Sequence, residues 1–159
     1  MDLRKGICIL KCEKGHQHGI VWLEEIKFGP VQFRVVIRNV TSGKHGFHIH
    51  RKGNELDGSI SLCDHFNPQN QLHGNINTKN SHAGDLGNLI AVDKMIDTEF
   101  VATRVRLSGI NSVFGRSLIV HENEDDLGKG PYEDSLTTGH SGKRILWGII
   151  GVDDGETCT

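Results

Sequence analysis

The sequence predicts an all-β protein, an eight-stranded antiparallel Greek-key barrel or sandwich with two long functional loops. Three observations support this fold class. Short segments alternate apolar and polar residues, and most are bounded by clusters of Gly, Asn, Asp or Ser. No segment carries a long apolar stripe at the helical spacing of 3.6 residues. With 159 residues, 20 of them Gly and only 3 Pro, the chain is expected to form one turn-rich domain, residues 1–159.

Eight segments are expected to be strands. The first two, "GICIL" and "GIVWLEE", each begin with a glycine. In the third, "VQFRVVIRN", Val31, Phe33 and Val35 share one face while polar residues occupy the other, as in a half-buried strand. The same short apolar character marks "GFHIH", "GNLIAVD", "TEFVATRVRL", "SLIVHE" and "ILWGIIGV". In chain order the expected strands are 6–10, 19–25, 31–39, 46–50, 87–93, 98–107, 117–122 and 145–152.

Two connections, about 51–87 and 123–143, are longer than ordinary loops. Ordering such a loop costs about 1 to 2 kcal/mol of backbone entropy per residue, so something must hold it in place. The first loop contains His65, His73, His82 and Asp85, whose side chains can bind a cation that clamps it. A short extension, 153–159, follows the last expected strand.

Composition limits the partners of the chain. A formal net charge of −2 gives no general attraction to nucleic acid or to an anionic membrane. No segment approaches the roughly 20 apolar residues that span a bilayer, and the apolar run in "MDLRKGICIL" is shorter than a signal-peptide core. We therefore expect a cytoplasmic protein with no nucleic-acid or membrane partner.

The segment "HGFHIH" suggests a metal site. On a strand, His48 and His50 lie on the same face and can present their imidazoles to one ion. Such a pair alone is more often structural than ligating. Further candidate ligands follow it at positions 65, 73, 82 and 85, and "VHE" supplies His121 from another strand. Chance does not readily produce this set.

The motifs "GFHIH", "HFNP", "HAGDLGN", "VHENEDDLGKG", "TGHSGKR" and "GIIGV" resemble, in order and spacing, those of the copper/zinc superoxide dismutase family. The resemblance covers nearly the whole chain. It implies copper and zinc as cofactors and superoxide as substrate. The implied reaction is dismutation to oxygen and hydrogen peroxide by alternating reduction and oxidation of the copper.

The resemblance also implies a role for each candidate residue. His65 would bridge the two metals and supply a proton. Asp125 would hydrogen-bond behind His48 and His73, and His45 would pack beneath the site. Three nitrogens and one carboxylate suit a closed, structural zinc site. The implied copper ligands are His48, His50, His65 and His121, and the implied zinc ligands are His65, His73, His82 and Asp85.

The second long loop is implied to shape a substrate channel. Arg144 matches the family arginine that anchors superoxide beside copper, so it is implied to be catalytic with His65. Glu133 and Asp134 are implied to line the channel. Thr137 stands where many members carry a lysine, so we expect weaker attraction of superoxide in this chain.

The family disulfide is absent, because Ser59 and Trp147 occupy its two positions. A substitute pairing of Cys63 or Cys158 is left open by the sequence. We expect maturation to need no thiol oxidation, which suits a reducing compartment.

The resemblance implies a homodimer. Phe114, Ile150 and Val152 keep the apolar character of the family interface, whereas Lys52 replaces a residue that is often aromatic. Dependence on a copper chaperone stays open. The rival functions are a metal-binding scaffold, a decoy, or the central domain of a copper chaperone. A chaperone would need a C-x-x-C thiol motif, which does not occur here, and a decoy is expected to have lost a ligand or Arg144.

Overall fold

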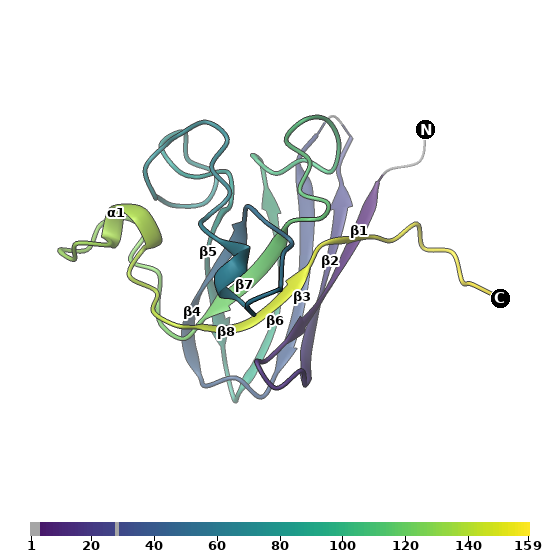
Figure 1. The fold of residues 1–159 in the computed structure, drawn as a ribbon, viewed down its shortest axis with the longest axis horizontal. Helices are drawn as coiled ribbons and strands as arrows, with labels where there is room; N and C mark the ends of the chain where they lie inside the picture. Colours follow the sequence, from purple (N-terminus) through teal and green to yellow (C-terminus); the bar gives the residue numbers. More distant parts are fainter. Residues whose placement is uncertain (1–3, 28) are drawn as a thin grey trace.

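The computed structural model describes residues 4–27 and 29–159; residues 1–3 and 28 of the expected domain lie outside the described part. The regular secondary structure of the described chain is almost all β-strand, curled into one barrel (Figure 1). Its strands are β1 (Lys5–Lys11), β2 (Gln17–Glu25), β3 (Val31–Arg38), β4 (Gly43–His50), β5 (Asp85–Ala91), β6 (Met95–Ala102), β7 (Ser117–His121), β8 (Arg144–Ile149) and β9 (Gly151–Val152). Two short helices, η1 (Ile60–Leu62) and α1 (Ser135–Thr138), lie in the long loops.

The strands pair antiparallel in the order β5-β4-β7-β8-β1-β2-β3-β6, with β9 beside β1. Strands β5 and β6 stand at the two ends of this order, so the sheet nearly closes on itself. The expectation of an all-β, antiparallel barrel is confirmed. Among the described residues no helix is both long and apolar enough to cross a membrane.

The core follows the alternation seen in the sequence. In β3 the alternating residues Val31, Phe33, Val35 and Ile37 are fully buried, while their neighbours are partly or fully exposed. Phe33 stacks on Phe100 of β6 with ring centroids 5.0 Å apart. Burial of such side chains contributes roughly 25 cal/mol per Å² of apolar surface, so these residues fix which face of each strand points inward.

Most strand ends differ from the sequence prediction by one to three residues, and two strands differ more. The expected strand 98–107 is shifted, because β6 begins at Met95 and ends at Ala102. Val105 and Leu107 are nonetheless buried, so their apolar pattern reflects packing of a turn-rich segment into the core. The expected strand 145–152 is divided at Ile150, whose N–H donates to the carbonyl of Arg116 instead of to a neighbouring strand of the ladder.

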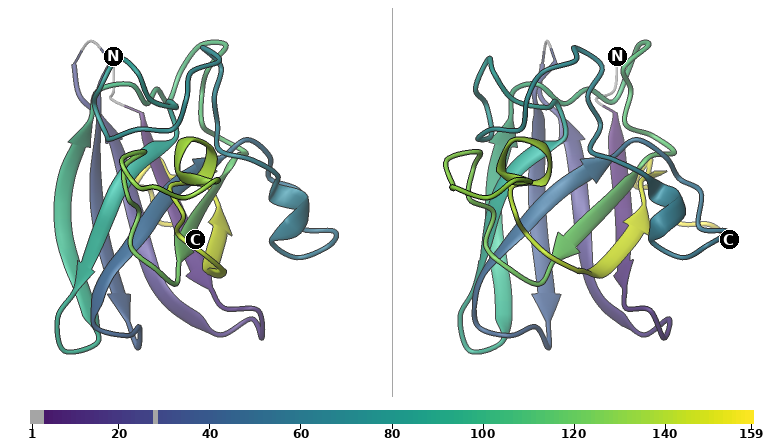
Figure 2. Two further views of the ribbon diagram at one scale, coloured as in Figure 1. Left: turned by 90° about the vertical axis from the view of Figure 1, so that its left-hand side faces the viewer. Right: turned by 60° about the vertical axis from the view of Figure 1, so that its left-hand side comes forward.

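The two long loops lie against the same side of the barrel (Figure 2). They touch directly, since the N–H of His73 in the first loop donates to the carbonyl of Leu136 in the second, at 2.9 Å. The segment around η1 projects from the barrel wall in both views of Figure 2. This arrangement encloses a histidine-rich site between strands and loops.

Candidate metal centre

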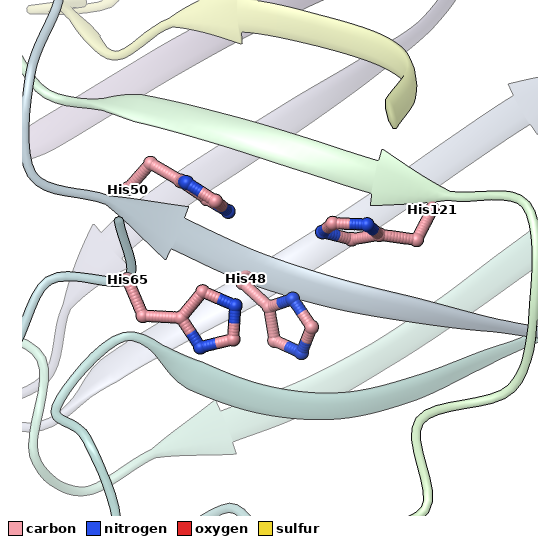
Figure 3. Close-up of side chains that lie close together, drawn as sticks. All are labelled: His48, His50, His65 and His121. Carbon is pink, nitrogen blue, oxygen red and sulfur yellow. The ribbon is translucent and has the colours of Figure 1, made fainter. Parts of the chain in front are cut away.

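Four histidines converge beside β4 and β7 (Figure 3). His48 and His50 alternate along β4 and so share a face, His121 ends β7 next to it, and His65 comes from the first long loop. Each offers a nitrogen within 4.8 Å of those of the others, and all four side chains are buried. We call this set, His48, His50, His65 and His121, the four-histidine cluster.

Each histidine of this cluster has one ring nitrogen in use and one free. Nδ1 of His50 faces the carbonyl of Cys63 at 2.6 Å, and Nδ1 of His121 faces the carbonyl of Gly142 at 3.0 Å. A carbonyl oxygen can only accept, so both Nδ1 atoms carry the proton and Nε2 keeps a lone pair. In the described part of the chain, the buried ring nitrogens without a partner are Nδ1 of His48 and Nε2 of His50, His65 and His121.

Buried polar atoms are normally hydrogen-bonded, because burial without a partner costs free energy. Four unpartnered lone pairs that face one another therefore need a common partner that accepts electron pairs. A transition metal that takes imidazole ligands, such as copper or zinc, fits this requirement. The donor set of the four-histidine cluster thus fits a resident metal ion.

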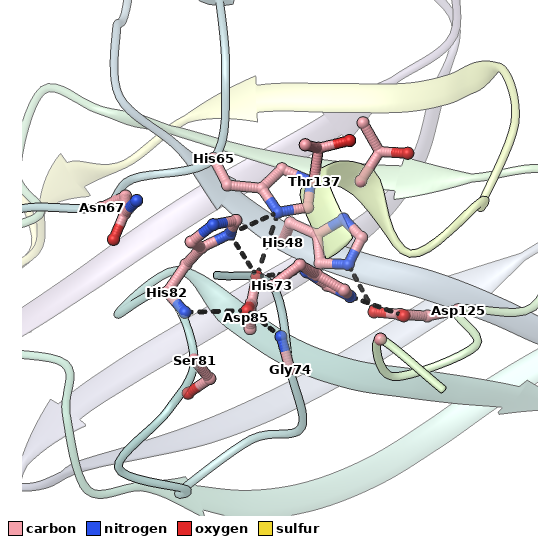
Figure 4. Close-up of polar contacts among 12 residues, drawn as sticks. His48, His65, Asn67, His73, Gly74, Ser81, His82, Asp85, Asp125 and Thr137 are labelled. Carbon is pink, nitrogen blue, oxygen red and sulfur yellow. Dashed lines mark hydrogen bonds and ion pairs between the residues drawn. The ribbon is translucent and has the colours of Figure 1, made fainter. Parts of the chain in front are cut away.

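A second cluster surrounds Asp85 (Figure 4). Its Oδ1 lies 3.0 Å from Nδ1 of His65, 2.9 Å from Nδ1 of His73 and 3.1 Å from Nδ1 of His82. Its Oδ2 accepts from the backbone N–H groups of Gly74 and His82. Three nitrogens and one carboxylate oxygen match a closed tetrahedral zinc site. We call His65, His73, His82 and Asp85 the Asp85 cluster.

His48 also lies close to this second cluster, since one of its ring nitrogens is within 4.8 Å of ligand atoms of His65, His73 and Asp85. It has only one nitrogen to offer, because its Nε2 is bonded to Asp125. We assign that nitrogen, Nδ1, to the four-histidine cluster. His82, with Nδ1 3.1 Å from both His65 and Asp85, completes the Asp85 cluster.

Electrostatics keep the four-histidine cluster neutral. Burial lowers the pKa of His48 and of His50 well below the ordinary value, and neighbouring His65 lowers both further. Burial also lowers the pKa of His65, and it lowers the pKa of His121 to about 4. Because a metal binds only deprotonated imidazole, these shifts leave the ligands ready at neutral pH.

In the Asp85 cluster, by contrast, hydrogen bonds outweigh the effect of burial on the pKa values of Asp85 and His73. Burial raises the pKa of Asp85, but hydrogen bonds from His65, His73 and His82 outweigh it and hold this pKa well below its usual range. Burial lowers the pKa of His73, yet its hydrogen bonds to Asp125 and Asp85 raise it overall to about 9. In the metal-free protein a proton on His73 thus takes the place of a cation between two carboxylates.

Asp125 joins the two clusters. Its Oδ2 accepts from Nε2 of His48 and its Oδ1 from Nε2 of His73, both at 2.7 Å. The backbone of Asp125 is fixed in turn by a pair of hydrogen bonds with Asn88 of β5. Gly139 packs so closely that a Cβ there would meet Oδ1 of Asp125 at 2.1 Å. Asn88 of β5 and the close approach of Gly139 therefore set the position of this carboxylate.

A cavity of about 580 Å³ opens onto the four-histidine cluster. Arg144, Asp134 and Thr137 line it, as do His50 and His121. Glu133, expected in the same channel, is exposed and does not line the cavity. The charged side chains on the described lining are Arg51, Arg144, Asp64 and Asp134, so it carries no formal net positive charge, and any attraction of a small anion depends on Arg144 beside the four-histidine cluster.

Outside both clusters, His45 is buried in β4 and lies within hydrogen-bonding distance of the carbonyls of His121 and Thr41, at 2.7 Å each. This agrees with the packing role expected for it. All four cysteines lie within the described residues and all are free, so no substitute disulfide forms. Arg144 is held by carbonyls instead, donating to those of Ser59 and Cys63. The sequence could not indicate these two acceptors, because a backbone carbonyl carries no residue-specific signal.

Comparison with known proteins agrees with this geometry. A family model described as copper/zinc superoxide dismutase (SODC) matches residues 17–150. The chain is 41% identical over 147 residues to superoxide dismutase [Cu-Zn] A of Xenopus laevis, covering 92% of this chain and 97% of that protein. It is also similar to the crystal structure of the clock protein EA4, with a TM-score of 0.89, 34% identity and 94% of each chain covered.

Proposed function

The chain belongs to the copper/zinc superoxide dismutase family, and from that premise we propose how its own residues bind the two metals and the substrate. It is a superoxide dismutase of the copper/zinc type. Two superoxide anions and two protons become one oxygen and one hydrogen peroxide. The family's cofactors are copper and zinc, and the two clusters fit them.

The ligands follow from the free nitrogens. Copper would be held by the four-histidine cluster, through Nδ1 of His48 and Nε2 of the other three. Zinc would be held by the Asp85 cluster. His65 belongs to both sets, since its Nε2 faces the first and its Nδ1 the second, and so would bridge the metals. Asp125 would orient His48 and His73 from behind.

Copper, when bound, supplies the one-electron couple that the reaction requires, while zinc has no redox chemistry and orders the loop. The chain's residues do the rest. Arg144 presents its guanidinium to the cavity and attracts the anionic substrate, positioned by its bonds to Ser59 and Cys63. His65 holds a proton at Nε2 in one half of the cycle and delivers it to the departing peroxide in the other.

The four unpartnered buried nitrogens are the observation that carries this proposal. We would load the protein with copper and zinc, measure both metals, and assay superoxide dismutation with and without a thiol reductant. We expect activity in both conditions, because no disulfide holds the loops. His121→Ala should lose copper and activity but keep zinc, whereas His18→Ala, in β2 and outside both clusters, should change neither.

The rival functions predict other results. Full metal loading without dismutation would favour a metal-binding scaffold or a decoy and would contradict the proposal. Loss of activity with reductant alone would contradict the disulfide-free maturation that we propose. A copper-chaperone role is disfavoured, because no C-x-x-C motif is present. Whether a chaperone loads the copper is a separate question that co-expression with and without one would answer.

We further propose a homodimer. Val152 of β9 is 74% exposed and pairs with Gly6, and the ring of Phe114 lies against the same glycine. Val152, Gly6 and Phe114 therefore form one apolar face. Lys52 is exposed, and its carbonyl accepts from the hydroxyl of Ser117. An exposed lysine at an interface rim can keep its charge in water, so it does not prevent association.

Other expectations stay proposals. A cytoplasmic location is supported by the four free thiols, since reducing compartments keep cysteines reduced. Greek-key topology is supported by the pairing of strands three apart, β3 with β6 and β4 with β7. The chain is proposed to act as a single domain, 1–159, with a metal loop at about 51–87, a channel loop at about 123–143 and an extension at 153–159. No nucleic-acid or membrane partner is expected, given the net charge of −2.

A further inference from the structure

Cys63 adopts a backbone conformation that residues with a Cβ rarely occupy. Its φ is 65° and its ψ is −146°, close to the region populated essentially by glycine. Such strain persists only where the surroundings impose it, and it is most often found at functional sites. The sulfur does not explain the conformation, because its one contact of note is a weak 3.6 Å hydrogen bond to the carbonyl of Ser61.

The carbonyl of Cys63 has two donors. Nδ1 of His50 donates to it at 2.6 Å and the Nη2 atom of Arg144 at 2.7 Å. Nη1 of Arg144 donates to the carbonyl of Ser59, which precedes η1, and the N–H of Cys63 donates to the carbonyl of Ile60 at 3.1 Å. Hydrogen bonds therefore hold both the N–H and the carbonyl of the strained residue, and the charged donor, Arg144, provides the stronger bond to that carbonyl.

We infer that the Cys63 peptide is a positioning element that couples the substrate-binding Arg144 to the ring of His50. One carbonyl fixes the direction of the guanidinium and the tautomer of His50. The same two donors hold that carbonyl in a conformation which the chain does not otherwise favour. Loss of the Arg144 bond allows the peptide to relax, and His50 then loses its acceptor. The inference rests on the proposed function for the roles of Arg144 and His50, but the coupling itself needs no metal.

A double-mutant cycle tests this coupling. The variants are Arg144→Gln, Cys63→Gly and both together, with Cys63→Ala as the matched control that removes the sulfur but keeps the Cβ and its strain. The readout is hydrogen exchange of the Nδ1 proton of His50, followed by NMR in the metal-free protein. A second readout is the electron paramagnetic resonance spectrum of Cu(II) in the loaded protein.

We expect Arg144→Gln alone to accelerate exchange at His50 by about tenfold or more and to shift the copper spectrum. In the Cys63→Gly background the same change should have a several-fold smaller effect, since glycine holds this conformation without help. Cys63→Ala should behave like the parent protein in both readouts.

Equal effects of Arg144→Gln with and without Cys63→Gly would overturn the inference. So would a Cys63→Ala variant that behaves like Cys63→Gly, because the effect would then belong to the thiol. Failure of the proposed function can be distinguished from failure of this inference. A protein that does not dismutate superoxide can still show the coupling in its metal-free form, and an active enzyme can lack it.

Discussion

At the scale of single residues, the chemistry of the site depends on which atom of each side chain is already in use. A histidine offers one lone pair, and the hydrogen bond made by its other nitrogen decides where that lone pair points. Asp125, Cys63 and Gly142 make this choice for His48, His50 and His121. The ligand set therefore depends on acceptors that never touch the metal.

Asp125 allows a direct test of this dependence. In Asp125→Asn the carboxylate becomes an amide with one acceptor oxygen, so His48 and His73 cannot both keep their present bonds. We expect zinc affinity to fall by about 10- to 100-fold, measured by competition with a chelator. The neighbouring Asp126→Asn is the control, because Asp126 bonds to Ser135 and Gly128 instead. An equal loss in both variants would contradict the assignment.

Cys8 makes a prediction about pH. Burial raises its pKa from 9.0 to about 12, so the thiol stays protonated in the folded protein. The folded-state pKa lies above the unfolded one, so this contribution to stability is fully present below pH 9. It is lost as the pH rises from about 9 to about 12, where only the unfolded chain ionises.

Two measurements check this. At pH 8, alkylation followed by mass spectrometry should label the exposed Cys158 and leave Cys8 unmodified until the protein is unfolded. Between pH 9 and 11, the urea midpoint should fall more steeply for the parent protein than for Cys8→Ala. Rapid labelling of Cys8 in the native protein would show that the thiol is accessible and the prediction wrong.

At the scale of elements, strands supply rigid ligands and loops supply the substrate path. Strands β4 and β7 present three of the four histidines of the four-histidine cluster through simple alternation. The short helix α1 places Thr137 on the cavity wall and exposes it to solvent. Because α1 is only four residues long, its position depends on the surrounding loop contacts.

Thr137→Lys should strengthen the attraction of superoxide. Charge steering is a known property of this family, and a lysine on α1 adds one positive charge near Arg144. At about 8 Å in water one added charge contributes about 0.5 kcal/mol, or roughly a twofold gain in kcat/KM at low salt. The gain should shrink as salt is added. Val92→Lys, exposed on the far β5–β6 turn, is the control with the same net charge. A gain in the control, or none in Thr137→Lys, would contradict the steering argument.

At the scale of the whole molecule, the barrel holds two long loops without a covalent link. The first loop is anchored by the fully buried Leu62 and by the hydrogen bond from the N–H of Phe66 to the carbonyl of Ile49 in β4. Ser61 braces the loop internally, because its hydroxyl accepts from the N–H of Asp57 and donates to the carbonyl of Asn54. The two metals would add the remaining constraint through side chains of that loop. Stability of the loop is therefore linked to metal binding by mass action.

The homodimer is tested at this scale by Val152→Glu. A carboxylate buried without a partner costs several kcal/mol, so we expect the variant to be monomeric by sedimentation equilibrium while the parent is dimeric. Val92→Glu introduces the same side chain at a valine that is 65% exposed on the opposite turn, and should leave the dimer intact. A monomeric parent protein, or a dimeric Val152→Glu, would contradict the proposed interface.

The sequence by itself determined the fold class and the family, because strand alternation and the spacing of histidines are local properties. It also named the seven side chains that the structure brings together in two clusters. Strand ends were less predictable, since Val105 and Leu107 pack into the core without joining a strand. Only the tertiary structure decided which nitrogen of each histidine is free, that Glu133 lies off the cavity, and that Cys63 and Ser59 hold Arg144. The free nitrogens of His50 and His121 and the position of Arg144 depend on backbone carbonyls that the fold brings close from distant parts of the chain, and a carbonyl is the same in every residue.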